Sequence, residues 1–143
     1  MLLHVPKCFT PDLMSLLMRM GHGEALLICD ANFPYSTVCR AAKAPVYITG
    51  FTVEQILREI LYYFPLDYAV KSAAVVMDSA KESELFRRYR EILSRAVQPT
   101  ELAAVSRMDF YDKAKAAAGV VVTSDTAKGG NIMIQKGVVR ESE

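Results

Sequence analysis

Short apolar runs of strand length alternate with helical segments along most of this 143-residue chain. The expected strands are 24–30, 44–50, 72–78, 101–107, 119–125 and 131–137, and the expected helices are 10–21, 52–65, 82–96 and 109–118. Such alternation predicts one α/β domain over residues 1–143, with three layers in which helices cover both faces of a mostly parallel sheet. Only TAKGG (126–130) separates the last two strands, so we expect them to form an antiparallel C-terminal hairpin.

The balance of charge and the small number of cysteines narrow the classes of function. The chain has 17 basic and 16 acidic residues and a net charge of +1, so no long-range field favours nucleic acid. Its three cysteines form no Cys-x-x-Cys pair, and MLLHVPKCFT lacks a signal-peptide core, which predicts a cytoplasmic location. No apolar run approaches the roughly 18 residues of a bilayer span, so we expect no membrane partner.

The motifs of several common active sites are missing from the sequence. The histidines do not form His-x-x-x-His and the cysteines do not cluster, as the common metal sites require. A Gly-x-Ser-x-Gly elbow and the phosphate-loop spacing are also absent. The sequence therefore predicts a site without a metal ion, and proton transfer on an uncharged polar ligand is left as the expected chemistry.

His22 is the only histidine in the body of the chain, and it lies between Gly21 and Gly23, after the first expected helix. The flanking glycines place no side chains beside the imidazole. Histidine gives and takes protons near neutral pH, as a general acid or base must. The alternative is a helix C-cap, in which the ring contacts the last carbonyls of the helix.

Asp30 follows the apolar run that begins at residue 25. Ligands of open α/β sheets bind outside the carboxyl ends of the strands, where a carboxylate can orient an imidazole or accept bonds from ligand hydroxyls. The alternative is a local turn in which Asp30 satisfies nearby backbone N–H groups. Because one strand length separates Asp30 from His22, we expect the two side chains in the same crevice.

Two further groups are expected at strand ends. Arg107 ends ELAAVSR, and its guanidinium can donate to ligand oxygens or pair on the surface with an acidic residue of the following helix. Gly129, Gly130 and Asn131 follow TAK, either as a simple Gly-Gly turn or as a place where the backbone approaches a ligand. The Asn131 amide both donates and accepts, as a partner of ligand hydroxyls must.

Four segments in the same order resemble the L-fucose mutarotase and D-ribose pyranase family. MGHGEALLICDANFP (20–34) resembles its Gly-His-Gly-Asp stretch followed by Ser-Asp-Ala-x-Phe-Pro, and RRYREIL (87–93) also matches. RMDFYDKA (107–114) resembles Arg-Phe-x-Phe-Tyr-x-Arg-Ala, and SDTAKGGNIMIQKGV (124–138) resembles the C-terminal segment around Tyr-Gly-Asn. Arg107 and the Phe-Tyr after it favour the fucose branch of the family.

The resemblance implies an isomerase that interconverts the α and β anomers of a free sugar, with L-fucose as the expected substrate and no cofactor. In that family the residue matching His22 transfers protons, and the residues matching Asp30, Arg107 and the stretch 129–131 contact the sugar. The resemblance also implies a homodecamer of α/β subunits whose sites are completed across subunit boundaries. The expected partners are therefore a monosaccharide and further copies of this chain.

Three residues depart from the family pattern: Glu24 replaces Asp, Cys29 replaces Ser and Gly129 replaces Tyr. The last change removes a ring and a hydroxyl from the sugar-contacting strip, and Tyr111 is a candidate replacement. Two other functions therefore stay open. One is a sugar-binding or regulatory protein with little turnover, and the other is pyranose to furanose interconversion, against which Arg107 argues.

Overall fold

The computed structural model describes residues 1–39 and 44–141, and it contains a strand in each of the six expected places. The strands are β1 (Ala25–Cys29), β2 (Val46–Ile48), β3 (Ala74–Met77), β4 (Leu102–Val105), β5 (Gly119–Thr123) and β6 (Ile132–Gln135). The helices are α1 (Pro11–Arg19), α2 (Tyr35–Val38), α3 (Val53–Leu61), α4 (Glu84–Ser94) and α5 (Arg107–Lys115), with a 3₁₀ turn, η1 (Asp78–Ala80).

The longer helices begin at polar caps that the sequence supplies. Thr10 caps α1 through its side chain, and Pro11 takes the first helical position. At α3, Thr52 and Gln55 form a reciprocal capping box, which satisfies two N–H groups at the start of the helix. The apolar residues of α3 then fall on one face, which is buried. These local signals explain why α1 and α3 start where the sequence predicts.

The sheet has the strand order β2-β5-β1-β6-β3-β4. β5 is parallel to β1 and β2, β3 is parallel to β4, and β6 runs antiparallel to both of its neighbours, β1 and β3. The mostly parallel α/β fold and the antiparallel last strand are therefore confirmed. The expected hairpin is wrong, because β1 lies between β5 and β6. The short loop between β5 and β6 suggested that these two strands pair, but β6 pairs with β1 along one edge and with β3 along the other.

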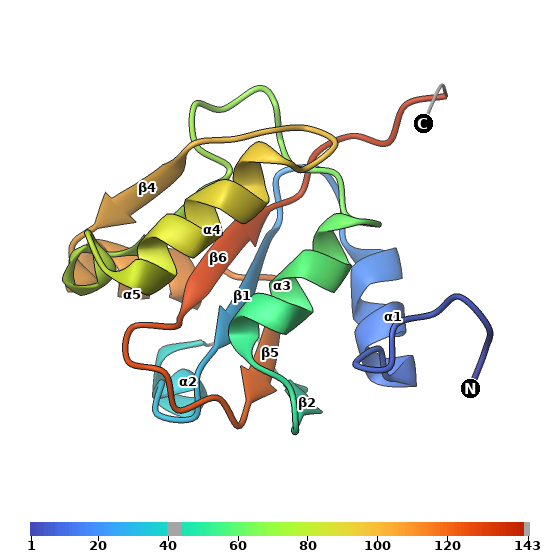
Figure 1. The fold of residues 1–143 in the computed structure, drawn as a ribbon, viewed down its shortest axis with the longest axis horizontal. Coiled ribbons are helices and arrows are strands. Elements are labelled where there is room, and N and C mark those ends of the chain that lie inside the picture. The colour runs from blue at the N-terminus through green and yellow to red at the C-terminus, as the bar shows by residue number, and fades with distance from the viewer. Residues whose placement is uncertain (40–43, 142–143) are drawn as a thin grey trace.

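Helices cover both faces of the sheet, which gives the predicted three layers. One face packs on α1, α3 and α4, and the other packs on α2 and α5. Figure 1 shows α3 and α4 crossing in front of the sheet, with α5 behind it. Neighbouring residues of β1 alternate between the two cores, with Leu26 and Ile28 on one face and Leu27 and Cys29 on the other.

Two short helical elements and one helix boundary differ from the prediction. The sequence predicted neither α2 nor η1. α2 has four residues and η1 has three, which are too few to show a helical period. Arg107 was expected at the end of a strand, but it is the first residue of α5, because Ser106 caps this helix through the Asp109 N–H. Within residues 1–39 and 44–141, no helix is long and apolar enough to cross a bilayer.

Candidate functional site

Asp30 follows the C-terminal end of β1, where the start of β6 runs beside it. The Asp30 and Asn131 residues are 6% and 5% exposed. Asn131 Nδ2 donates to Asp30 Oδ2 at 3.2 Å, and the Asp30 N–H donates to Asn131 Oδ1 at 2.8 Å. The Asn32 N–H donates to Asp30 Oδ1 at 2.9 Å, which is the local turn considered as an alternative. Both side chains are therefore fixed in place by the protein itself.

The loop from β5 to β6 passes the end of β1 and carries two glycines. Gly129 has a φ of +76°, and a Cβ there would lie 3.3 Å from the Cβ of Ala80, so a tyrosine would be strained in this backbone. The buried Gly130 accepts the Tyr89 hydroxyl on its carbonyl at 2.7 Å. Burial raises the pKa of Tyr89, which keeps this hydroxyl protonated. Tyr89 thus ties α4 to the segment that presents Asn131.

Replacing Tyr89 by phenylalanine removes this hydroxyl and keeps the ring in the core. We expect the free energy of unfolding to fall by about 1–3 kcal/mol, because the buried Gly130 carbonyl loses this partner. Urea denaturation measures the change. Tyr62→Phe, at a residue that is 78% exposed, is the matched control with no expected effect. Equal stability of the two variants would contradict the assigned role of the bond.

Arg107 lies at the same end of the sheet as Asp30, but several strands away. β6 and β3 lie between β1 and β4, so three strand spacings, roughly 14 Å, separate the two strand ends. Arg107 is exposed. In the described part of the chain no ion pair joins it to Asp109 or Asp112, and Asp112 instead pairs with Lys115 at 3.4 Å. The guanidinium is therefore available to a ligand or to another chain.

Tyr111 also belongs to this end of the sheet. Its ring packs edge-on against Phe33, with centroids 5.5 Å apart, and Phe33 follows Asp30 by three residues. The ring of Phe33 makes a similar contact with Phe110, at 5.9 Å. The hydrophobic cluster on this face of the sheet thus brings a half-buried tyrosine near the end of β1.

His22 precedes β1, in a turn formed by residues 21–24 at the opposite end of the strand. Gly23 has a φ of +84°, and its N–H donates to the Lys136 carbonyl at 2.8 Å. The Gly21 N–H donates to Glu24 Oε2 at 2.7 Å, so the residue that replaces the family aspartate closes this turn. The turn leaves the His22 side chain 53% exposed. Gly23 and Glu24 thus build the turn that presents the imidazole to solvent.

The His22 ring bonds to Asp67, and this bond takes the place of the helix-cap alternative. His22 Nε2 lies 3.2 Å from Asp67 Oδ2, and Asp67 is 3% exposed. Asp67 also accepts the Ala69 N–H at 2.9 Å and Gln135 Nε2 at 3.0 Å. The Ala69 N–H above all, together with His22 and Gln135, holds the pKa of Asp67 below its usual value despite burial. The carboxylate is therefore ionised at neutral pH.

His22 and Asp30 do not share a crevice within one chain. His22 lies before β1 and Asp30 lies after it, and the five residues of the strand advance roughly 16 Å. β6 runs antiparallel beside β1, so Asn131 adjoins Asp30 while Gln135 adjoins the bonded pair of His22 and Asp67. The prediction that Asp30 lies with His22 is therefore wrong for a single chain, because Asp67 holds the imidazole.

A groove of about 320 Å³ is lined in part by Gly23 and Glu24, the two residues that follow His22 in the sequence. It lies between the N-terminal ends of β1 and β3 and the C-terminal end of α5, and its polar lining residues are Glu24, Ser72, Lys113 and Gln135. Small-molecule sites commonly measure roughly 300–1,000 Å³. The groove therefore has room for a small polar ligand, and its lining residue Gln135 links it to Asp67, the partner of His22.

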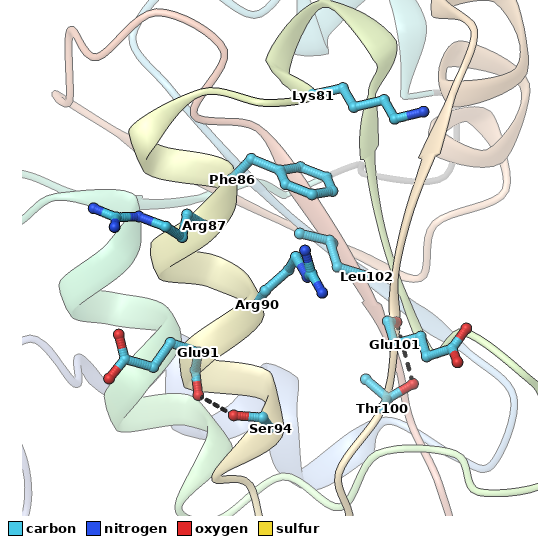
Figure 2. Close-up of a pocket in the computed structure, with 9 residues that line it drawn as sticks. All are labelled: Lys81, Phe86, Arg87, Arg90, Glu91, Ser94, Thr100, Glu101 and Leu102. Carbon is cyan, nitrogen blue, oxygen red and sulfur yellow. Dashed lines mark hydrogen bonds between the residues drawn. The ribbon is translucent and has the colours of Figure 1, made fainter.

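Another groove, of about 600 Å³, lies between α4 and β4, as Figure 2 shows. Lys81, Phe86 and Arg90 face the groove, while Arg87 and Glu91 point away from it. Its lining contains neither a histidine nor a residue from either end of β1. In residues 1–39 and 44–141 no group of three or more His, Cys, Asp or Glu side chains is placed to hold a metal ion.

Sequence reasoning missed Asp67, Gln135 and Tyr89. Asp67 follows FPL in a segment without helical or strand periodicity, so no local pattern marks it as a site residue. The one available signal was its apolar neighbours, because a carboxylate that is buried among them needs hydrogen-bond partners. Gln135 was expected only as part of a strand. Its signal was a polar side chain directly after an apolar run, which can form a hydrogen bond with another segment at the end of the strand. Tyr89 lies on the buried face of α4, and a buried tyrosine hydroxyl requires a hydrogen-bond partner.

Comparison with known proteins places the chain in a family. Residues 4–139 match the RbsD / FucU transport protein family. The chain belongs to this family. A protein of Danio rerio named fucose mutarotase is 38% identical over 145 residues, covering 97% of this chain and 95% of its own length.

Two more RbsD / FucU relatives agree with this assignment. A fucose mutarotase of Homo sapiens is 39% identical over 142 residues, which cover 94% of this chain and 92% of that protein. A crystal structure of the fucose mutarotase of Streptococcus pneumoniae in complex with L-fucose has a TM-score of 0.85 and 32% identity, over 97% of this chain and 100% of that one. The resemblance stated from sequence motifs is confirmed.

Proposed function

We propose that this protein is an isomerase that interconverts the α and β anomers of L-fucose by acid and base catalysis. The observation that carries the proposal is similarity over nearly the whole chain to proteins named fucose mutarotase, including one solved with L-fucose. The chain also offers the required chemistry, because the His22 side chain is half exposed and its imidazole is hydrogen-bonded to the buried Asp67 carboxylate.

The reaction opens and recloses the sugar ring. The His22 imidazole takes the proton of the anomeric hydroxyl, and the O–H electron pair forms the carbonyl as the bond between C1 and the ring oxygen breaks. The ring oxygen receives the bond pair and takes the proton back from the imidazolium. After the aldehyde group rotates, the same steps in reverse close the ring on the other face. A positioned acid and base group typically contributes about 10²–10⁴-fold.

The other expected site residues position the sugar. Asp30 and Asn131 form a rigid acceptor and donor pair for hydroxyl groups, and Arg107 donates to sugar oxygens. Gly129 and Gly130 let the backbone of their loop approach the ring closely. The hydroxyl of Tyr111 takes the place of the family tyrosine that Gly129 replaces.

We place these groups around one sugar by joining two copies of the chain. The His22 end of one subunit meets the Asp30 and Arg107 end of the next, in the homodecamer that the family resemblance implies. Apolar side chains are exposed on the segments that hold the His22 end together: Tyr68, Val70, Val138 and Val139. An exposed apolar group of this kind favours contact with another protein surface.

A cytoplasmic location fits the state of the cysteines. Cys8, Cys29 and Cys39 are all buried and free. Burial raises the pKa of Cys29 to about 12 and that of Cys39 to about 11, which keeps both thiols protonated and unreactive. Free thiols of this kind are typical of reducing compartments.

A second candidate, a sugar-binding or regulatory protein with little turnover, is favoured by Gly129 alone. NMR magnetisation exchange between the two anomers of L-fucose separates the candidates, with D-ribose and D-galactose measured beside it. We expect wild-type protein to accelerate the exchange of fucose most. Exchange at the buffer rate for every sugar, together with saturable binding of fucose, would identify a binding protein instead.

A further inference from the structure

The groove between α4 and β4 is lined by residues that the proposed function does not use. Its volume is about 600 Å³, and none of the residues assigned to the sugar lines it. Lys81, Phe86 and Arg90 face it, and Leu102 extends into it from β4 (Figure 2). A second hollow, of about 500 Å³, adjoins it at the start of α4 and shares Lys81, Phe86 and Arg90. The groove therefore has room for a ligand much larger than a single ion.

The basic residues of this groove differ in whether an acidic residue neutralises them. Arg87 pairs with Glu84 at 2.6 Å, and its guanidinium points away from the groove. Lys81 and Arg90 make no ion pair and no side-chain hydrogen bond with any residue of 1–39 or 44–141. Both are exposed, and they come from different elements, the loop after η1 and the middle of α4. Two unpaired cations therefore face the same groove.

The acidic residues around the groove do not neutralise these two cations. Glu91 points away from the groove and pairs with Arg95 at 2.7 Å. Glu101 lines the groove from β4, but its side chain extends away from α4. Glu82 lines only the second hollow. The space between the helix and the strand therefore favours a ligand that carries negative charge.

We propose that this groove binds a small phosphate monoester, whose phosphate lies between Lys81 and Arg90 and whose organic part is a sugar or nucleoside ring system. A guanidinium donates two parallel hydrogen bonds to phosphate oxygens, and an ammonium group supplies a second positive charge for the dianion. Phe86 and Leu102 offer an apolar surface on which a ring packs. This site is additional to that of the proposed function, because a neutral sugar would leave both cations without a counter-charge.

Isothermal titration calorimetry of the full chain with glucose 6-phosphate and with adenosine monophosphate tests the proposal, because the two esters share the phosphate and differ in the ring. We expect saturable binding of at least one ester, and the tighter one identifies the ring system. The binding should weaken at higher salt, which screens the two cations. Inorganic phosphate has no ring to pack on Phe86 and Leu102, and its Kd should be about 10-fold higher. No saturable binding of either ester, or equal binding of inorganic phosphate, would overturn the proposal.

Arg90→Gln shows whether the ester binds in this groove. We expect the Kd to rise by about 10-fold or more, because the amide carries no charge and cannot donate as a fork. Arg95→Gln is the matched control, since it makes the same change on the same helix at a residue that does not line the groove. Lys81→Gln, in the loop before α4, should weaken binding as well. An unchanged Kd in Arg90→Gln, or an equal rise in Arg95→Gln, would overturn the assignment.

The exchange of L-fucose anomers provides an independent check on the Arg90→Gln variant. Arg90 is exposed and is not one of the residues assigned to the sugar, so we expect wild-type exchange from this variant. Such exchange also shows that the variant is folded. If wild-type protein does not accelerate exchange, the proposed function fails, while calorimetry still tests the phosphate monoester site on its own.

Discussion

His22→Ala is expected to abolish the catalysed exchange of L-fucose anomers, so that only the uncatalysed exchange rate of the sugar in buffer remains. The imidazole is the group that takes and returns the proton, and such a group typically contributes about 10²–10⁴-fold. The loss should come without unfolding, because the side chain is half exposed and the turn that carries it is held by bonds from Gly21 and Gly23. Magnetisation-exchange NMR gives the rate, and circular dichroism checks the fold.

His4→Ala is the control for that experiment. His4 is the other histidine of the chain. It lies in the N-terminal segment and is not one of the residues of the candidate site. Its carbonyl accepts the Tyr63 hydroxyl at 3.1 Å, and the substitution keeps that carbonyl. We expect wild-type exchange from this variant. Wild-type exchange from His22→Ala as well would remove His22 from the mechanism.

Two inactive variants are expected to restore activity when they assemble together. Arg107→Ala changes an exposed residue at the end of the sheet opposite His22. We expect the exchange rate to fall by about 10- to 100-fold, as for the loss of a charge-assisted hydrogen bond of about 1.5–3 kcal/mol. If one site takes His22 from one copy and Arg107 from the next, co-expression with His22→Ala leaves about one site in four intact. Exchange should then return to about a quarter of the wild-type rate.

The same experiment contains its own controls. Each variant expressed alone gives the residual rate, and separately purified variants that are combined without subunit exchange should stay at that level. A site contained in one chain predicts no recovery in the co-expressed sample. That result would contradict the joining of two copies, while the role of His22 would stand on its own variant.

The fold was predictable because its signals are local. The capping box at Thr52 and Gln55 and the apolar face of α3 both lie within one short segment, and each strand is a short apolar run. The hairpin prediction failed because strand pairing is not local. β6 pairs with β1, more than 100 residues earlier in the chain, through contacts that sequence spacing does not encode.

The candidate site was predictable as a set of residues but not as an arrangement. His22 and Asp30 are eight residues apart, and that spacing suggested proximity although an extended strand separates its own ends by its full length. The partner of His22, Asp67, comes from a segment 45 residues away that carries no motif. A hydrogen bond between distant segments depends on the tertiary fold, so residue types alone do not reveal it.

The place of β6 in the sheet has a consequence for how the chain folds. β2, β5 and β1 form one half of the sheet and β3 and β4 form the other, and β6 is the strand that joins them. It is also the last of the six strands to leave the ribosome. Until it does, β1 and β3 each expose an unpaired inner edge, which is a template for aggregation. The sheet therefore closes only after β6 has been made, and a chain that stops before Ile132 lacks the strand that joins the two halves.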